Sequence, residues 1–498
     1  MKSLTLPVLT SGVASGEDVT PSASQRDGNP RTYSILDNVL GPVGRGPSSS
    51  HTMAPHRASL EAFGVLGGAP DLARVQFLNS FATTGEGHRS HVAVAAGLLG
   101  LVPEDERFPR ALEAAREAGL EIQFEHEVDY AEHPNTIYME LRRGDKRLNM
   151  KVVSTGGGNY DIQGDYTGQQ IRRGDGGGPT MLATADARLL RALPVMQRAV
   201  ELSRPTWRAY ADLAAELGVG CAEFALLLEA YVQINKGGLQ TIGEVWDAVD
   251  QVLRVMLAAV AAGSADRQTT QVTPGDWGTR LIQADTLFGD LWHAFVGGIA
   301  AQEYNAGMGV VAAAPTGGAS GTLPGVLHGL MKTLDASAGQ LIEALLVAGL
   351  VGLVAFSRGP VSGAQSGCGG EIGVAAMMAA GAASHLRGGG WEEADAAAAL
   401  AGQLFVGLEC SPVGGNVEYP CIPRNGFAAV VAIAAAEAAG AGVSPPHYGL
   451  DATLDRIFAV GSLLPRELRE TEDGHWAGNF IRMSCCGQGG CRDCPVSG

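Results

Sequence analysis

The hydrophobic pattern of this chain changes near residue 183, and this change limits its fold more than any other feature. From about residue 183 to about residue 439, segments of period two are almost absent. Ala, Leu and Gly instead fill long windows of helical periodicity, for example at 223–233, 336–356, 371–386 and 394–408. We therefore expect an all-helical domain over residues 183–483, in which small residues permit close helix contacts.

The residues before this change have the mixed pattern of an α/β domain, which we place at residues 33–162. An amphipathic segment at 109–118 predicts a helix. Period-two alternation predicts strands at 122–124, 136–141 and 149–154. The predicted fold class is therefore α+β, with a small α/β domain followed by an all-helical domain.

Three further segments have the periodicity of neither domain. Residues 1–32 are rich in Ser, Gly, Pro and Thr, which predicts a mobile extension. Residues 163–182 combine glycines with charges, which predicts a Gly-rich linker. Residues 484–498 contain four cysteines and form a distinct tail.

Composition and charge exclude several classes of partner. Asp and Glu outnumber Lys and Arg by 52 to 35 among 498 residues, so the field of the protein repels nucleic acid and anionic membranes. The N-terminus lacks the charged-then-apolar layout of a secretory signal. The longest apolar run, at 344–356, has about 13 residues, fewer than the ~20 that span a bilayer. We expect a cytoplasmic protein that binds neither nucleic acid nor membranes, with this run as a buried core helix.

The eight cysteines are unevenly distributed. Cys221 is alone, whereas Cys368, Cys410 and Cys421 all lie in the predicted helical domain, and the other four are in the tail. In a cytoplasmic chain such clustering favours metal ligation over disulfides. Separations of 42 and 11 positions between the three helical-domain cysteines do not fit the CxxC spacing of a zinc finger.

Three thiolates without a close fourth partner suit a four-iron cluster in which one iron stays open as a Lewis acid. Cys368 lies just before a predicted helix, where the helix dipole stabilises a thiolate. The spacing alone is equally consistent with three buried free cysteines. The surrounding sequence has to decide between these two interpretations.

Glycine-rich motifs surround the cysteines and recur in the first domain. The helical domain contains GCGGEIG at 367–373, CSPVGGNVEYPCIPRN at 410–425 and APTGGASGTLPGVL at 314–327. The first domain contains GPVGRGPSSSHTMAPHRA at 41–58, SFATTGEGH at 80–88, HPNT at 133–136 and STGGGN at 154–159. In content and order these motifs resemble those of the iron-sulfur-dependent L-serine dehydratases. The resemblance covers both predicted domains and is weaker from about residue 165 to residue 290.

This resemblance implies a fused single-chain enzyme, with the α/β domain before a catalytic domain that binds the cluster. It implies an oxygen-sensitive 4Fe–4S cluster held by Cys368, Cys410 and Cys421. The implied reaction converts L-serine to aminoacrylate, whose imine hydrolyses to pyruvate and ammonia, as in amino-acid metabolism and gluconeogenesis. A homodimer is also implied. No pyridoxal phosphate is expected, because none of the five lysines lies in a convincing cofactor-binding motif.

The resemblance also implies the catalytic base. His51 follows three serines in a Gly- and Pro-rich turn and corresponds to the histidine of the family's motif. Ser48, Ser49, Ser50 and Thr52 offer hydroxyls and backbone amides for a substrate carboxylate. The same residues can instead cap the helix that we expect to begin near residue 55.

Five further residues match family positions and are candidates for substrate binding in a cleft between the two domains. His88 orients the substrate or has a structural role. Asn159 brings backbone close to the domain interface or completes a turn. Thr316 and Asn425 lie near the cluster segment, and Arg424 faces a carboxylate, a helix end or a salt-bridge partner.

Several residues depart from the family's pattern around the predicted ligands. Gly369 stands where glutamine is usual, Glu409 and Ser411 replace threonine and aspartate beside Cys410, and Pro423 replaces a glutamate. Neighbours of a cluster tune its charge and the shape of the pocket, so substrate recognition can differ. The alternative reactions are cysteine desulfidation and β-elimination on a modified serine in specialised biosynthesis.

The tail adds Cys485, Cys486, Cys491 and Cys494. In some relatives a terminal cysteine reaches back to the cluster, so one of these thiolates is a candidate additional ligand of the open iron. Cys491 and Cys494 form a CxxC pair, which also suits a separate zinc or sulfur-handling site. Adventitious thiols in a disordered tail are the third interpretation.

An alternative from another class is a redox or oxygen sensor that carries the cluster without catalysis. His51 in its Ser/Thr context argues against a sensor, because a sensor has no need of a base. Inactivity towards every amino acid despite an intact cluster would favour it.

Overall fold

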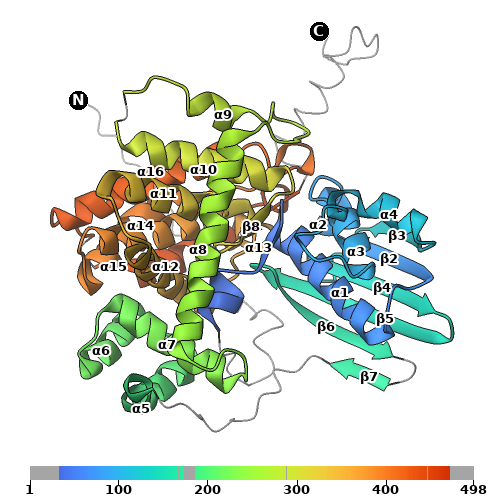
Figure 1. Cartoon of the computed structure of the whole chain (residues 1–498), viewed down its shortest axis with the longest axis horizontal. Helices are drawn as coiled ribbons and strands as arrows, with labels where there is room; N and C mark the ends of the chain where they lie inside the picture. The colour runs from blue at the N-terminus through green and yellow to red at the C-terminus, as the bar shows by residue number, and fades with distance from the viewer. Residues whose placement is uncertain (1–32, 167–168, 173–185, 288, 446, 472–498) are drawn as a thin grey trace, which may run out of the picture. The chain divides into compact units, whose positions relative to one another are not determined.

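The computed structural model describes residues 33–166, 169–172, 186–287, 289–445 and 447–471. Thr32–Gly498 clusters as one unit, in which a sheet with helices α1–α4 is joined to a larger helical part (Figure 1). The α+β fold class is confirmed. The predicted extension at 1–32 and the Cys-rich tail at 484–498 lie outside the described residues.

The sheet has the strand order β3-β2-β4-β5-β6-β7, with β2 parallel to β3 and the other neighbours antiparallel. Met139 on β4 and Met150 and Val152 on β5 are buried at every second position, and they pack with the alanines of α1. The strands predicted from period-two alternation are thereby confirmed. The strands are β2 (Leu72–Leu78), β3 (Glu121–Glu127), β4 (Thr136–Arg143), β5 (Lys146–Gly156), β6 (Asn159–Tyr166) and β7 (Gln169–Arg172).

The helices of this part place two histidines beside the helical part. α1 (Ala54–Leu66) follows directly on the turn that carries His51, and α3 (Ser90–Leu98) begins two residues after His88. α2 (Ser80–Thr84) follows β2, and α4 (Ala111–Glu117) continues the 3₁₀ turn Phe108–Arg110. The helix predicted at 109–118 is confirmed.

The predicted linker at 163–182 differs from the structure in its first part. Residues 163–166 complete β6, and Gln169–Arg172 forms β7, which pairs with β6 in antiparallel register. An edge hairpin is held by backbone hydrogen bonds and does not require an apolar face, so polar and glycine-rich residues concealed it. Residues 173–182 of the predicted linker lie outside the described residues.

The second part is helical apart from the short strand β8 (Val310–Ala312). The predicted windows at 223–233, 336–356 and 371–386 all lie in helical segments, whereas the helix at 394–408 ends earlier, at Gly402. The helices are α5 (Ala187–Glu201), α6 (Trp207–Leu217), α7 (Cys221–Asn235), α8 (Ile242–Ala265), α9 (Trp277–Leu281), α10 (Leu291–Ala306), α11 (Thr322–Leu334), α12 (Ala338–Arg358), α13 (Gly363–Cys368), α14 (Val374–Leu386), α15 (Trp391–Gly402), α16 (Cys421–Gly440) and α17 (Leu450–Ser462).

Small residues allow the central helices to approach closely. A Cβ at Gly325 of α11 would lie 2.6 Å from the backbone nitrogen of Gly298 on α10, and a Cβ at Gly329 would lie 2.7 Å from the Cβ of Ala294. Such short distances leave no room for larger side chains. The expected close helix contacts are therefore confirmed.

The first described residues belong to the core of the helical part, although the sequence pattern assigns them to the α/β domain. Ile35 and Val39, in the π-helical turn η2 (Ile35–Val39), are fully buried in the helical core. Glu229 of α7 accepts hydrogen bonds from the Ser34 hydroxyl (2.7 Å) and the Ile35 amide (2.6 Å). β1 (Val43–Arg45) then pairs antiparallel with β8. The chain therefore crosses from the helical part to the sheet just before His51.

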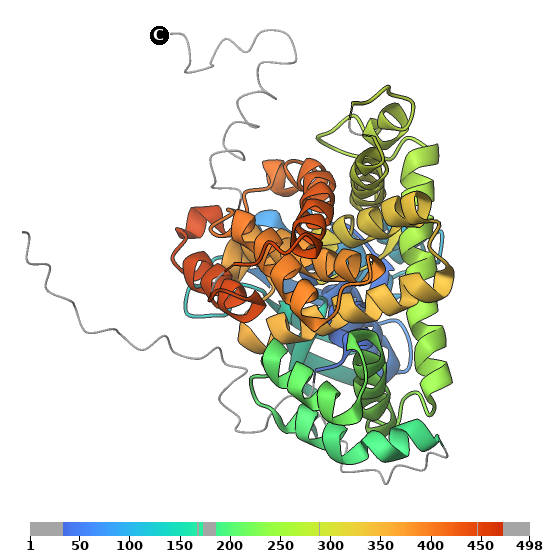
Figure 2. The ribbon, with the colours of Figure 1, turned by 90° about the vertical axis from the view of Figure 1, so that its left-hand side faces the viewer.

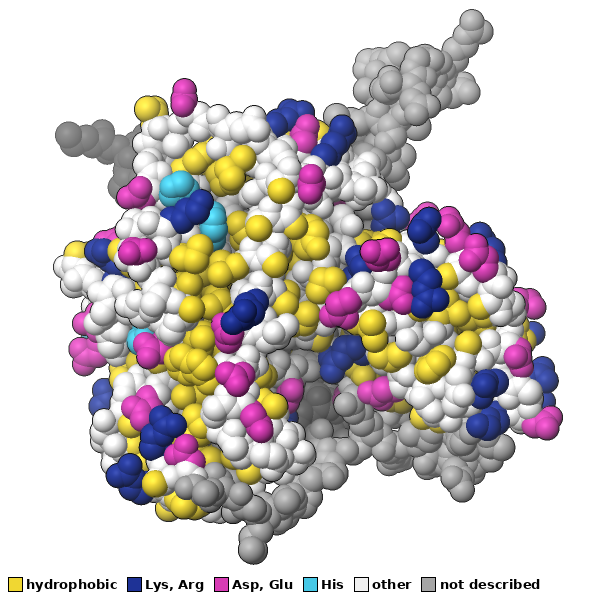
Figure 3. All heavy atoms as spheres, in the orientation of Figure 1, with side chains coloured by type: hydrophobic (Ala, Val, Ile, Leu, Met, Phe, Trp, Pro, Cys, Tyr) yellow, Lys and Arg dark blue, Asp and Glu magenta, His cyan; other side chains and the backbone are white. Residues whose placement is uncertain are grey.

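Three helices, α8, α12 and α16, are long and apolar enough to cross a membrane by length and composition. In α12 78% of the apolar window is buried inside the protein, which confirms the predicted core helix at 344–356. α8 is 39% buried and lies along the outside of the helical part (Figures 1 and 2). Apolar side chains are visible along it among scattered charged residues (Figure 3).

Candidate active site

The serine-rich motif forms a π-helical turn, Ser49–Met53, at the start of α1. The hydroxyl of Ser48 caps this turn by accepting a hydrogen bond from the His51 amide (3.1 Å). The hydroxyl of Thr52 accepts from the Ser48 amide (3.1 Å) and donates to the His88 carbonyl (2.6 Å). The hydroxyls of Ser48 and Thr52 therefore fix the turn, as the capping interpretation of the motif expects.

The hydrogen bonds of His51 define which ring nitrogen carries the proton. The Ser80 hydroxyl donates to the Glu470 carbonyl (3.0 Å), so it accepts from Nε2–H of His51 (3.1 Å). Nδ1 is then the unprotonated nitrogen, and it accepts from the Ser50 hydroxyl at 2.8 Å. Burial lowers the pKa of His51 to about 3, so the ring is neutral at physiological pH. Nδ1 therefore has a lone pair that can accept a proton.

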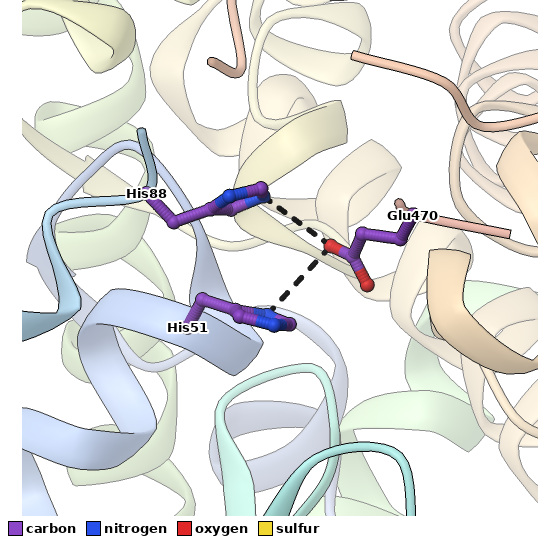
Figure 4. A group of neighbouring side chains, drawn as sticks. All are labelled: His51, His88 and Glu470. Carbon is purple, nitrogen blue, oxygen red and sulfur yellow. Dashed lines mark ion pairs between the residues drawn. The ribbon is translucent and has the colours of Figure 1, made fainter. Parts of the chain in front are cut away.

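Two histidines and a carboxylate from distant parts of the chain meet at this site (Figure 4). Nδ1 of His51 lies 3.7 Å from Oε1 of Glu470, and Nε2 of His88 lies 3.5 Å from the same oxygen. All three residues are buried. Nδ1 of His88 donates to the Thr84 carbonyl (2.9 Å), which directs Nε2 towards Glu470.

Glu470 was not among the residues singled out from the sequence. It lies at the end of the described helical part, where its amide donates to the Cys410 carbonyl (2.7 Å). Arg469 forms a parallel bridge with Cys410. The sequence RELRETE around Glu470 is mostly charged and has no motif, so one sequence alone contains no signal that this carboxylate is buried.

The three helical-domain cysteines lie in one region, and all are buried. Cys368 ends α13, Cys421 begins α16, and Cys410 lies between them in an extended segment. The Sγ atoms of Cys368 and Cys410 and a carboxylate oxygen of Glu371 lie within 4.8 Å of one another. The hydrogen bond between the two thiols lowers the pKa of Cys368 and raises the pKa of Cys410, so Cys368 ionises first. Burial raises the pKa of Cys421.

Groups from both clusters approach the backbone at Gly363. A Cβ at Gly363 would lie 2.7 Å from Oε2 of Glu371, 2.9 Å from Sγ of Cys410 and 3.4 Å from the carboxyl carbon of Glu470. The Cys410 thiol and both carboxylates therefore surround a position at which only glycine fits. This donor set fits a metal group, with sulfur ligands that suit iron or zinc. Glu371, like Glu470, was missed from the sequence.

The other candidate residues are engaged in holding the framework. Oδ1 of Asn425 accepts from the amides of Gly321 (3.1 Å) and Thr322 (2.9 Å), and so caps α11. The guanidinium of Arg424 pairs with the side chain of Glu409. This salt bridge is not at the surface, because the positive charge of the same guanidinium favours the thiolate forms of the buried Cys368 and Cys421.

Thr316 and Asn159 lie on either side of the same junction. The Thr316 side chain faces Glu371, whose pKa is raised by burial and by Glu470. Asn159 accepts from Nδ2 of Asn38 (2.8 Å), which ties the β5–β6 turn to the crossing segment. The four tail cysteines lie outside the described residues.

Comparison with known proteins agrees with this arrangement. Residues 34–161 match the serine dehydratase beta chain family, and residues 146–477 match the serine dehydratase alpha chain family. An L-serine dehydratase of Streptomyces coelicolor is 30% identical over 90% of this chain and 99% of its own length. L-serine dehydratase 1 of Escherichia coli is 29% identical over 89% of this chain and 98% of its own length.

A relative named as an alpha chain also matches. A probable L-serine dehydratase alpha chain of Bacillus subtilis is 35% identical over 47% of this chain and 80% of its own length. The boundary between the two family matches falls at β5 and β6, near the end of the sheet. This chain is therefore a member of the serine dehydratase family, with its beta-chain and alpha-chain regions in one polypeptide.

Proposed function

We propose that this protein deaminates L-serine by β-elimination, giving pyruvate and ammonia. The observation that supports this most directly is that the neutral ring of His51 lies 3.7 Å from Glu470, and that the Glu470 carboxyl group and the Cys410 thiol both lie close to Gly363. A neutral imidazole in a buried site can accept a proton from the α-carbon of an amino acid. The substrate, L-serine, is proposed from the names of the relatives, and His51 supports the proton-transfer step that its deamination requires.

Cys368, Cys410 and Cys421 are the residues that would hold a 4Fe–4S cluster. When bound, such a cluster supplies a Lewis acid for the substrate hydroxyl and carboxylate. A tail cysteine, from Cys485, Cys486, Cys491 and Cys494, is proposed as an additional ligand at rest. We further propose that the enzyme acts in the cytoplasm as a homodimer.

The proton steps use atoms of this chain. Nδ1 of His51 accepts the α-proton, while Nε2–H stays bonded to the Ser80 hydroxyl, so the ring keeps its orientation. The Ser50 hydroxyl, which donates to Nδ1 in the resting structure, turns away. The imidazolium that forms lies 3.7 Å from the Glu470 carboxylate, which stabilises its charge. The electron pair of the Cα–H bond forms the Cα=Cβ bond as the Cβ–O bond breaks, and the proton held by His51 is returned to the leaving hydroxyl, which departs as water. The aminoacrylate product then hydrolyses through its imine.

The test is anaerobic purification followed by iron and sulfide analysis and assays with L-serine and L-cysteine. Four irons per chain with pyruvate and ammonia from L-serine are expected. Sulfide release from L-cysteine in preference to serine turnover would replace the proposal with a desulfidase. An intact cluster without turnover of either amino acid would favour the sensor, and a protein without iron would refute the cluster.

A further inference from the structure

Glu470 is a buried carboxylate without a cationic partner among the residues that the structure describes. Its side chain is 5% exposed, and its ion-pair contacts are with the two imidazoles alone, not with Lys or Arg. Its second oxygen, Oε2, has no hydrogen-bond partner. A buried charge normally has a partner, because removing it from water costs several kcal/mol, on the order of the whole stability of a small domain.

The two imidazoles are too far from Glu470 to act as close charged partners of its carboxylate. Charge-assisted hydrogen bonds between nitrogen and oxygen are about 2.7–2.9 Å long. The separations here are 3.7 Å from His51 and 3.5 Å from His88. Nε2–H of His51 donates to Ser80 and Nδ1–H of His88 donates to the Thr84 carbonyl, so Nδ1 of His51 and Nε2 of His88 are the nitrogens that face Glu470. Nδ1 of His51 accepts from the Ser50 hydroxyl at 2.8 Å, so the group without a partner at this place is Oε2 of Glu470.

The protein holds Glu470 in this position at a cost in backbone strain. Its φ is +56°, a left-handed conformation that residues other than glycine rarely adopt. Its amide is bonded to Cys410 from the helical part, and its carbonyl accepts from Ser80 of the sheet part. A strained residue fixed from both sides is typical of a functional group.

We propose that the carboxylate of Glu470 binds the α-ammonium group of the amino-acid substrate beside His51 and His88. This inference rests on the proposed function, since it assigns a part of the same site. An ammonium group has one positive charge and three donors, which suits a buried carboxylate with an unpartnered oxygen and leaves Nδ1 of His51 to accept the α-proton. The α-carbon is one bond from the ammonium nitrogen, so this placement brings the α-proton to His51.

The cluster region lies beside this ammonium site. The position of Gly363 is within contact distance of Glu470, Glu371 and Cys410 together, so a substrate held by its ammonium group at Glu470 has its other groups next to the thiols. The site would then select amino acids over hydroxy acids and carboxylic acids of the same length. Glu470 is a binding and positioning residue in this scheme.

The test measures binding with an unreactive pair of ligands. L-Alanine has no leaving group, and propanoate is the same molecule without the ammonium group. Their dissociation constants are measured anaerobically by calorimetry on the full holoenzyme and on Glu470→Gln, which keeps the shape and removes the charge. We expect Glu470→Gln to raise the dissociation constant of L-alanine by about 10- to 100-fold, the range for loss of a hydrogen bond to a charged group. The dissociation constant of propanoate should change by less than about twofold.

Two further variants separate binding from folding. Glu470→Asp keeps the charge and is expected to recover part of the affinity for L-alanine. Glu303→Gln is the matched control, because Glu303 is also fully buried and accepts from the amides of Trp277 (3.1 Å) and Gly278 (2.9 Å), away from the site. It is expected to bind both ligands as the natural protein does.

Three results would overturn the inference. Equal loss for L-alanine and propanoate in Glu470→Gln would make Glu470 structural, and no change for either ligand would remove it from the site. Two imidazoles and a carboxylate also suit a divalent metal. One equivalent of zinc, manganese or iron beyond the cluster, lost in Glu470→Gln, would assign the site to that ion.

The same measurements distinguish this inference from the proposed function. Discrimination of L-alanine from propanoate that depends on Glu470, without turnover of L-serine, would retain the ammonium site and reject the dehydratase reaction. Turnover of L-serine with unchanged KM and kcat in Glu470→Gln would retain the dehydratase reaction and reject the ammonium site.

Discussion

The turn at Ser48–Met53 and the segment around Glu470 face each other across the candidate site, and they differ in how completely their polar groups are paired. In the turn, the hydroxyls of Ser48, Ser50 and Thr52 all have partners, and both nitrogens of the His51 ring are bonded. Across the site, Glu470 has an unpartnered oxygen. Paired groups set geometry, whereas an unpaired buried charge is available to a ligand. In the proposed mechanism the sheet part would orient the base, and the helical part would provide the charged groups for cofactor and substrate.

The largest effect is expected from removing one of the three thiols of the helical part. Cys410→Ala should lose bound iron and all measurable activity on L-serine, because the other two cysteines cannot hold a four-iron cluster. Iron and sulfide analysis of the anaerobically purified variant measures this. Cys221→Ala is the matched control, since Cys221 is buried in α7, and it should retain four irons. Full iron content in Cys410→Ala would contradict the assignment of the ligands.

In the turn at Ser48–Met53, His51→Gln should lower kcat by about 100- to 10,000-fold, the range for loss of a general base. The cluster should remain, as shown by iron content, because His51 is separate from the thiols. His56→Gln is the control: His56 is a buried imidazole on α1 that bonds to the Leu101 carbonyl (2.8 Å). A similar loss of kcat in both variants would point to a folding defect instead of a lost base.

Filling the space between the two sides should have an intermediate effect. Gly363→Ala places a methyl group 2.7 Å from Glu371 and 2.9 Å from Cys410, so it should reduce iron retention and lower activity by about tenfold or more. Iron content and kcat/KM on L-serine report the change. Unchanged values for both would show that the volume near Gly363 is not part of the site.

Burial of His51 predicts a dependence of stability on pH. Its pKa is about 3 in the folded chain and near 6.5 when exposed, so between these values the unfolded state binds the extra proton. Stability is therefore lost as the pH falls below about 6.5, at up to about 1.4 kcal/mol per pH unit from this one group. Urea unfolding of iron-depleted protein at pH 7 and pH 5 should show a smaller loss in His51→Gln. An equal loss in both proteins would mean that His51 is protonated in the folded chain.

The smallest effect is expected away from both sides. Gly64 lies within α1, and an added Cβ would meet nothing within 4 Å. Gly64→Ala should raise the free energy of unfolding by about 0.5–1 kcal/mol, because alanine loses less backbone entropy in a helix. Urea unfolding measures the gain, and activity should stay unchanged. A destabilised or less active variant would show that α1 transmits strain to the turn before it.

Periodicity was enough to predict the sheet-containing and the all-helical regions of the fold, and the motifs predicted a site with His51 and the three cysteines. The pattern did not predict β7, because an edge hairpin is held by backbone hydrogen bonds and needs no alternation of apolar residues. The pattern of residues 33–45 also did not reveal that Ile35 and Val39 pack in the helical core and that β1 pairs with β8, because apolar side chains do not show which part of the chain they contact. Glu371 and Glu470 were missed because burial of a carboxylate depends on tertiary packing, and nothing local to either residue encodes it.

The crossing of residues 33–45 into the helical part has a consequence for how the chain can be divided. Glu229 anchors the Ser34 and Ile35 end, and β1 completes a two-stranded sheet with β8. A gene cut between β7 and α5 would therefore produce two polypeptides that still share a hydrophobic core. Residues 33–45 of the shorter polypeptide would pack in the core of the longer one. We expect such halves to co-purify as an obligate pair, and the longer half alone to expose an apolar groove along α12.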